Sequence, residues 1–199
     1  MPSWLFRLLA RCLWGRGTEV VTVGDDRGAV TGKARDRAPE TRSPEKGAVK
    51  LCLVSSSGGH LEQLMRLAPL LERYEGFFVT EETDYDVGFG AATVFRIPSI
   101  NRTDAGFAGK LVRGFAAAAR LLRQEGPTVI ISTGALSALP LLVVGKLRGC
   151  RIIYVESFAK VTEPTLTGKV AYRLADQFYV QWEPLLSCYP KALYRGGIY

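Results

Sequence analysis

The chain contains 199 residues with a formal net charge of +7 and a pI near 9.4, and 47% of its side chains are hydrophobic while 23% are charged. This composition is that of a globular protein with enough apolar material for one core. The positive charge favours an anionic partner, but the folded part carries no Lys/Arg stripe with interleaved aromatic residues, so we expect no nucleic-acid partner.

The amino-terminal residues 1–17 have the pattern of a short amphipathic helix. Apolar side chains share one broad face and arginines lie toward its edges: Trp4, Leu5, Leu8, Leu9, Cys12 and Leu13, with Arg7, Arg11 and Arg16. Such a helix suits an anionic membrane surface. Since the chain has neither an apolar run of about 18 residues nor an A-x-A-like cleavage site, we expect peripheral attachment at the cytoplasmic face of the membrane. The alternative is a frayed terminus or a helix packed on the core.

Residues 18–48 mix glycine, proline, threonine and both signs of charge, which is typical of a flexible linker. After them, apolar runs alternate with helical patterns. The expected strands are 50–56, 76–81, 93–99, 127–133, 151–157 and 177–181, and the expected helices are 61–74, 109–126, 136–149 and 166–176. Because parallel strands need helical crossovers, this alternation predicts an α/β domain over residues 49–181: a Rossmann-like parallel sheet with helices on both faces.

The cysteines give no sign of a metal site. Cys12, Cys52, Cys150 and Cys188 are far apart and form no CxxC pair, and the chain has a single histidine. We therefore expect no metal ion and no other cofactor. Isolated cysteines of this kind indicate reduced, mostly buried thiols in a cytoplasmic protein.

Ligands of a doubly wound sheet bind outside the carboxyl ends of its strands, which selects the segments 55–60, 133–135 and 156–158. The first segment runs from a strand into a helix start and contains Ser55, Ser56, Ser57, Gly58 and Gly59. Its glycines allow close approach, and free N–H groups with the helix dipole favour an anion such as phosphate or diphosphate. It matches neither GxGxxG nor the Walker pattern, which argues against a dinucleotide or a nucleoside triphosphate. A generic glycine-rich turn is the alternative.

His60 ends this segment and is the only imidazole of the chain. At a helix N-terminus the dipole disfavours its protonation and leaves the ring available as a base or a neutral donor. The alternative is a histidine that only caps the turn.

The other two segments carry further candidates. Thr133, Gly134 and Ser137 suit a phosphate or a sugar hydroxyl, although such a sequence is also an ordinary turn between a strand and a helix. Glu156 ends an apolar strand, where a carboxylate should lie near the ligand crevice. It could bind a sugar hydroxyl or assist His60; alternatively it pairs with a base such as Lys160 or Arg173.

The carboxyl-terminal residues 182–199 carry more large apolar side chains than a solvated tail would: Trp182, Leu185, Leu186, Tyr189, Leu193, Tyr194, Ile198 and Tyr199. We expect this segment to dock a partner subunit, chiefly through Trp182, Tyr189, Leu193, Tyr194, Ile198 and Tyr199. The alternative is that the segment packs back on its own sheet.

Four stretches, taken in order, resemble one family: SSSGGHLEQLMRL, STGALSALPLLVVGKL, RIIYVESFAKVTEPTLTGKVAYRLADQFYVQW and YPKALYRGGIY. They resemble the PssD-like family of bacterial exopolysaccharide and capsule assembly. They are also similar to the membrane-anchor subunit of the eukaryotic N-acetylglucosaminyltransferase that acts on dolichol-linked oligosaccharide. The order of the motifs is similar, too, to the acceptor domain of MurG-type transferases. The resemblance covers about residues 49 to 199.

The resemblance implies the N-terminal half of a GT-B glycosyltransferase that binds a lipid-diphosphate-linked glycan. A separate PssE-like subunit would bring the UDP-sugar, and the active centre would lie between the two. By position, Ser57, Gly58, Gly59 and His60 match the family's glycine-rich loop, and Glu156 matches its later acidic residue. Two rival hypotheses are a non-catalytic scaffold that recruits the transferase subunit to the membrane, and a self-sufficient small α/β enzyme.

Overall fold

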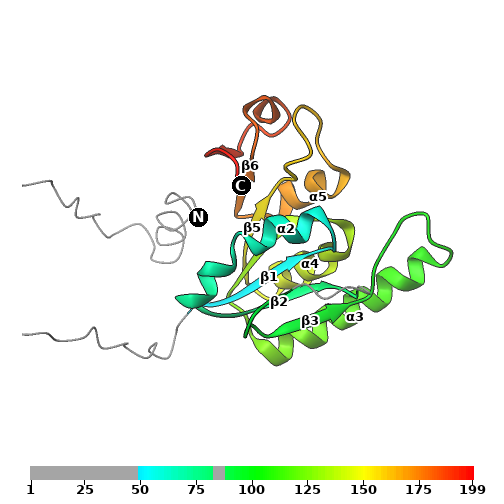
Figure 1. Cartoon of the computed structure of the whole chain (residues 1–199). Coiled ribbons are helices and arrows are strands. Elements are labelled where there is room, and N and C mark those ends of the chain that lie inside the picture. The colour runs from blue at the N-terminus through cyan, green and yellow to red at the C-terminus, as the bar shows by residue number, and fades with distance from the viewer. Residues whose placement is uncertain (1–48, 83–87) are drawn as a thin grey trace, which may run out of the picture. The chain divides into compact units, whose positions relative to one another are not determined.

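The computed structural model describes residues 49–82 and 88–199, and these contain one seven-stranded sheet in the order β3-β2-β1-β4-β5-β6-β7 (Figure 1). Every neighbouring pair of strands is parallel. The strands are β1 Lys50–Ser55, β2 Glu75–Glu81, β3 Val94–Ile97, β4 Val129–Gly134, β5 Arg151–Val155, β6 Gln177–Val180 and β7 Leu193–Tyr194. The expectation of a Rossmann-like parallel sheet is confirmed.

Helices cover both faces of this sheet. Three of them, α3, α4 and α5, pack in a row on one face, while α2 and the 3₁₀ helix η1 lie on the other. Their bounds, with two further 3₁₀ helices, are α2 Gly59–Met65, η1 Ala68–Glu72, α3 Phe107–Glu125, η2 Leu136–Ala138, α4 Leu139–Leu147, α5 Leu166–Leu174 and η3 Glu183–Ser187.

Most elements begin and end within two residues of the ranges expected from the sequence, and three differences are larger. The helix expected over 61–74 stops at Met65 and resumes as η1, because Pro69 lacks a backbone N–H and its ring clashes with the carbonyl four residues earlier. The helix expected over 136–149 starts as a 3₁₀ turn and becomes α-helical only at Leu139. The third difference is β7, which the sequence did not reveal.

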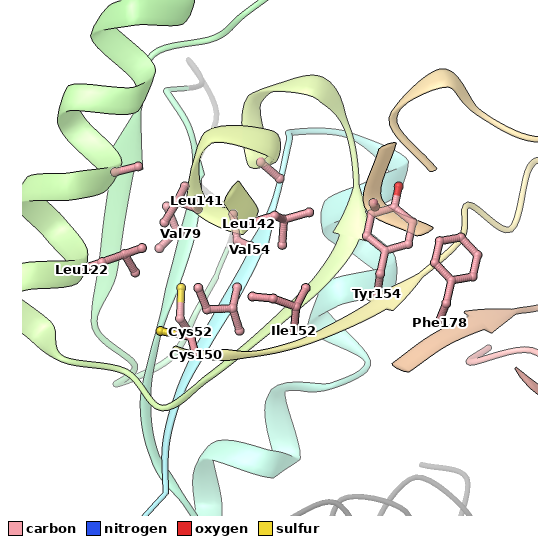
Figure 2. Packing of buried hydrophobic residues seen from close by; sticks show 14 of the residues in the cluster. Cys52, Val54, Val79, Leu122, Leu141, Leu142, Cys150, Ile152, Tyr154 and Phe178 are labelled. Atoms are coloured by element: carbon pink, nitrogen blue, oxygen red, sulfur yellow. The ribbon is translucent and has the colours of Figure 1, made fainter. Parts of the chain in front are cut away.

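The main core lies between the sheet and the row formed by α3, α4 and α5 (Figure 2). Val54 and Ile152 from the strands meet Leu142 from α4, and all three are fully buried. Each such side chain stabilises the fold by about 1.5–3 kcal/mol relative to exposure. Cys52 and Cys150 lie in the same core, where burial raises the pKa of both thiols and Cys150 Sγ donates to the Pro127 carbonyl at 3.1 Å.

Residues 49–199 form one compact unit. The segment 182–199 therefore packs back on the domain, which is the alternative that the sequence left open. The expected membrane-associating segment 1–17 and the expected linker 18–48 lie outside the described residues. Within the part of the chain that the structure describes, no helix is both long and apolar enough to cross a membrane.

Candidate functional site

A cleft of about 680 Å³ opens at the carboxyl edge of the sheet, around the strands β1 and β4. These two strands are neighbours from which the chain proceeds toward opposite sheet edges, which is the switch point where open α/β sheets bind ligands. Every strand from β1 to β5 contributes a lining residue at or beyond its carboxyl end: Ser56, Glu81, Ser99, Ile100, Asn101, Arg102, Thr103, Ala135, Leu136, Lys160, Pro164, Thr165, Leu166 and Thr167.

Two basic side chains line the cleft, and neither was expected from the sequence to bind a ligand. Arg102 comes from the segment after β3, and Lys160 comes from the segment after β5. Their sign suits an anionic ligand, and a guanidinium with several donors suits phosphate oxygens in particular. The signal available in the sequence was their place shortly after a strand end, combined with the net positive charge of the chain.

The glycine-rich segment reaches the cleft only in part. Ser56 lines it, whereas the buried Ser55 donates its hydroxyl to the Ser56 carbonyl at 2.9 Å. Ser57 donates from its hydroxyl to the Glu81 carboxylate at 3.1 Å, and from its backbone N–H to the same oxygen at 3.4 Å. Gly58 has a φ of 69° and precedes α2, and Gly59 is its first residue. Glu81, which the sequence analysis did not single out, thus fixes the position of Ser57 beside the cleft.

His60 is anchored to the end of β4. Its Nδ1 lies 2.8 Å from the Thr133 carbonyl oxygen, and the Thr133 hydroxyl donates to the His60 carbonyl at 2.8 Å. Because a carbonyl oxygen only accepts, Nδ1 carries a proton in this contact, and in the neutral form of the ring Nε2 is the acceptor. The imidazole packs closely on Gly134: a Cβ there would meet two of its ring atoms at 2.9 Å. His60 itself does not line the cleft, although the neighbouring Ala135 does.

The segment after β4 has an unusual backbone. Gly134 has a φ of 122°, and Ala135 has a φ of 75° with a ψ of 158°, a region that side-chain-bearing residues rarely adopt. Among the described residues, Ala135 is the only non-glycine residue with positive φ. Close by, Ser137 is buried and its hydroxyl has no hydrogen-bond partner within the described part of the chain. Strain and an unsatisfied hydroxyl at a ligand crevice are both frequent features of functional sites.

Glu156 does not face the cleft. It is fully buried, and its carboxylate accepts from the Ser157 N–H at 2.9 Å, from the Thr165 hydroxyl at 2.9 Å and from the Tyr189 hydroxyl at 2.6 Å. Burial and the adjacent Glu156 raise the pKa of the Tyr189 phenol, which stays a donor. The sequence hypothesis that Glu156 pairs with Lys160 or Arg173 is not supported, since no ion pair joins it to a base within the described ranges.

The segment 182–199 is divided between core and surface. Of its six predicted docking residues, Tyr189 and Ile198 are buried within the domain, Trp182 and Leu193 are half-buried, and Tyr194 and Tyr199 are exposed, by 37% and 54%. A docking surface of the folded chain therefore excludes Tyr189 and Ile198, because both side chains already have intramolecular neighbours.

The last residues lie against α2 and the segment after β5. Tyr199 packs edge-on against Phe158 with ring centroids 4.8 Å apart, and the Arg66 guanidinium lies 5.5 Å from the Tyr199 ring centre. Trp182 packs on the same phenylalanine at 4.9 Å and donates from its indole N–H to the Phe158 carbonyl at 2.7 Å. The chain end is thus held at the carboxyl edge of the sheet, the edge on which the cleft opens.

No group of three or more His, Cys, Asp or Glu side chains gathers as metal ligands would, as far as residues 49–82 and 88–199 are concerned. The chemistry that the cleft and its surroundings offer is that of hydroxyls, backbone groups, two bases, the carboxylate of Glu81 and one nearby imidazole. The Glu81 carboxylate already accepts two hydrogen bonds from Ser57.

Comparison with known sequences identifies a family. The family described as "Oligosaccharide biosynthesis protein Alg14 like" matches residues 99–198. Relatives named "UDP-N-acetylglucosamine transferase subunit ALG14" are similar over more of the chain. The one from Eremothecium gossypii is 31% identical over 174 residues, covering 71% of this chain and 76% of the relative. The human one is 24% identical over 181 residues, covering 76% and 83%.

Comparison with solved structures extends the likeness to the fold. Acinetobacter baumannii MurG superposes with a TM-score of 0.59 at 15% identity, over 68% of this chain and 42% of that protein. Methanocaldococcus jannaschii UDP-GlcNAc 2-epimerase, solved with UDP-GlcNAc and UDP, gives 0.59 at 14% identity, over 75% and 47%. The chain spans less than half the length of either protein. At these identities the likeness establishes the fold alone, which is that of the N-terminal domain of GT-B enzymes.

Proposed function

The chain belongs to the family of oligosaccharide biosynthesis proteins like Alg14, and from this membership we propose that it is the acceptor-binding subunit of a two-component glycosyltransferase. Its partner would carry the nucleotide-sugar site, and the transferred group would come from a UDP-sugar. The relatives' name suggests UDP-N-acetylglucosamine as this donor. The acceptor would be a glycan linked to a lipid through a diphosphate.

The observation that carries this proposal is the cleft at the switch point with Arg102 and Lys160 on its walls. A diphosphate has several anionic oxygens, which two bases from different segments could bind. The Ser56 hydroxyl, which donates to the Ser57 carbonyl at 3.2 Å, would join them by rotating toward the ligand. The predicted acceptor site also includes Ser55, Ser57, Gly58, Gly59, Thr133, Gly134 and Ser137. Because the hydroxyls of Ser55, Ser57 and Thr133 donate within the chain, we propose that this set contributes mainly backbone groups and the Ser137 hydroxyl. We expect no cofactor.

His60 is our candidate for the catalytic base. With Nδ1–H held by the Thr133 carbonyl, Nε2 has a free lone pair that accepts a proton from the acceptor hydroxyl as that hydroxyl attacks the sugar carbon. The new glycosidic bond forms while the bond to the UDP leaving group breaks, and the partner stabilises the charge on the departing nucleotide. Because the two groups lie on different subunits, one subunit alone would be nearly inactive.

The proposal is tested with the full chain co-expressed with its nucleotide-sugar subunit. We expect His60→Ala to lower transfer by roughly two to four orders of magnitude, the usual loss for a general base, while the partner still co-purifies. Arg102→Met combined with Lys160→Met should mainly raise KM for a lipid-diphosphate acceptor. If both variants transfer sugar at the unchanged rate and KM, the cleft is not the acceptor site.

A non-catalytic scaffold is the second candidate, and one observation favours it. His60 contacts the Thr133 carbonyl through Nδ1 and does not line the cleft. Both features would be expected of a histidine that only holds two loops together. A scaffold that merely recruits the transferase predicts full activity of the assembled complex with His60→Ala.

Membrane attachment is part of the proposal and involves residues 1–17. We propose peripheral binding to an anionic surface at the cytoplasmic face, through the apolar side and arginines of this segment. Each base near such a surface contributes about 1 kcal/mol, and salt screens it. Deleting residues 1–17 should therefore release the protein from anionic vesicles in flotation assays. Equal flotation of the truncated chain contradicts this assignment.

Docking of the partner would use the exposed aromatic residues of the segment 182–199. Replacing Tyr194 and Tyr199 together by serine should abolish co-purification, because interfaces rely on a few large aromatic anchors. The melting temperature should stay close to that of the unmodified chain, since neither side chain belongs to the core. Val112→Ser, at a residue of α3 that is 68% exposed, provides the control and should leave the complex intact.

The biological setting that we propose is bacterial exopolysaccharide or capsule assembly, with a PssE-like partner. An adjacent reading frame that encodes a short nucleotide-sugar-binding chain would support this setting. The other outcome is that the chain acts in a dolichol-dependent pathway, as its resemblance to the eukaryotic relatives would imply.

A further inference from the structure

Glu156 has an unusual environment for a carboxylate. It is fully buried, and its partners are neutral donors from three different places in the chain: Ser157, Thr165 and Tyr189. A buried carboxylate is costly unless donors satisfy it, and bonds to a charged acceptor are about twice as strong as neutral ones. These contacts therefore hold the three segments together more firmly than ordinary hydrogen bonds would.

One of these partners belongs to the cleft. Thr165 lines it and is also the N-cap of α5, where its hydroxyl oxygen accepts from the Gly168 N–H at 2.7 Å. The same hydroxyl donates to Glu156, so a single oxygen fixes both the helix start and the cleft wall. Between the two anchored residues Ser157 and Thr165 lies Lys160, one of the two bases of the cleft. The chain segment that carries Lys160 is therefore held at both ends by hydrogen bonds to Glu156.

Another partner belongs to the C-terminal segment. Tyr189 is buried, its ring lies against Phe178 and Tyr172 at 4.5 and 5.0 Å, and its hydroxyl reaches Glu156 at 2.6 Å. Gly168 leaves room for this meeting: a Cβ there would overlap the Glu156 carboxylate and lie 2.6 Å from the Tyr189 hydroxyl. Tyr189 thus connects the segment 182–199 to Glu156, the same residue that holds Thr165 in the cleft wall.

We propose that Glu156 is a positioning residue that couples the seating of the C-terminal segment, through Tyr189, to the anion-binding geometry of Thr165 and Lys160. This inference rests on the proposed function, because it takes the cleft as the diphosphate site. It assigns Glu156 no contact with substrate. A partner that docks on residues 182–199 would then also set the affinity of the cleft for its acceptor.

The test uses the full chain and inorganic pyrophosphate as the probe, with its affinity measured by calorimetry. Tyr189→Phe removes one hydroxyl and keeps the ring. Glu156→Gln keeps the volume but replaces an acceptor oxygen by an NH₂ group that faces donors. We expect each to weaken pyrophosphate binding by roughly ten-fold, about the worth of one hydrogen bond to a charged group. The control is Tyr172→Phe: its hydroxyl accepts from the Lys191 N–H at 2.7 Å and does not touch Glu156, so affinity should not change.

A second readout follows the network itself. The N–H groups of Ser157 and Thr165 donate to Glu156, at 2.9 and 3.4 Å, so their hydrogen exchange reports how firmly the cleft wall is held. Tyr189→Phe should speed their exchange by roughly ten-fold or more, whereas Tyr172→Phe should leave it unchanged.

The outcomes separate this inference from the proposed function. If the unmodified chain binds pyrophosphate and Lys160→Met weakens it, but Tyr189→Phe and Glu156→Gln bind as before, then the coupling is wrong while the cleft assignment stands. If Tyr172→Phe weakens binding as much as Tyr189→Phe does, the effect is general loosening of the segment and the coupling through Glu156 is overturned. If the unmodified chain does not bind pyrophosphate at all, the cleft assignment fails and the coupling with it.

Discussion

The segments that follow β4 and β5 both border the cleft, but different forces hold them in place. At the end of β4 and just beyond it the residues are uncharged, and the backbone itself is distorted, with positive φ at Gly134 and Ala135. After β5 the turn is fixed by side-chain hydrogen bonds to one buried carboxylate, that of Glu156. The conformation of the first segment requires that Gly134 has no side chain, and that of the second requires hydrogen-bond donors placed around Glu156.

This difference predicts different sensitivities. A segment shaped by close backbone approach should tolerate the loss of a polar group and should respond strongly to one added carbon. A segment shaped by a buried carboxylate should respond to the loss of any donor, because the charge is then left less satisfied. Three substitutions test what holds each segment: one displaces Glu156 from its donors, one adds a carbon against the His60 ring, and one relieves the strained backbone.

The largest effect is expected at Gly168, in the segment held by hydrogen bonds. Gly168→Ala should destabilise the fold by about 3 kcal/mol, since the new methyl group overlaps Glu156 and displaces its donors. Urea unfolding measures the change. The matched control is Gly109→Ala in α3, where a Cβ meets no atom and a helical alanine should stabilise by about 0.5–1 kcal/mol. Equal free energies of unfolding for the two variants would show that the Glu156 side chain can move aside without destabilising the fold.

The next effect concerns Gly134, in the segment shaped by its backbone. Gly134→Ala should cost about 2 kcal/mol, because alanine is strained at a φ of 122° and its methyl group meets the His60 ring. The ring should turn and lose the contact between Nδ1 and the Thr133 carbonyl. Nitrogen-15 shifts of the imidazole check this, since they report which ring nitrogen carries the proton. Unchanged shifts would mean that Gly134 does not determine the tautomer of His60.

The smallest effect is expected at Ala135 and has the opposite sign. Ala135→Gly should stabilise the fold by about 1 kcal/mol, because relief of a strained φ outweighs the greater freedom of glycine in the unfolded chain. Thermal unfolding with and without pyrophosphate measures the change. A loss of stability contradicts the view that this backbone is strained.

Much of the fold could be predicted from the sequence, because buried parallel strands appear as continuous apolar runs such as 127–133 and 151–157. The switch-point rule selected the edge of the sheet at which the cleft opens, and Ser56 lines that cleft. The seventh strand escaped prediction since Leu193–Tyr194 is too short to leave a pattern, and only its neighbour β6 defines it.

The candidate site was harder to predict, because its contacts join residues distant in sequence. Glu156 was recognised as an unusual residue, but its partner Tyr189 lies 33 positions further along and had been assigned to a docking tail. The path of the segment after β3 could not be read from local pattern either, and so Arg102 was missed. Whether Ser57, His60 and the other predicted residues contact substrate stays a prediction.

The reactivity of the two thiols in the main core can be used to follow the unfolding of the domain. Cys52 in β1 and Cys150, just before β5, lie close together in the same apolar layer, and burial suppresses their thiolate forms. An alkylating reagent needs a thiolate that it can reach, so these sulfurs should react only when the sheet separates from α3 and α4. Of the three cysteines in the described residues, Cys188 is exposed and should react first. The interval between these reactions would give the opening rate of the core without any introduced label.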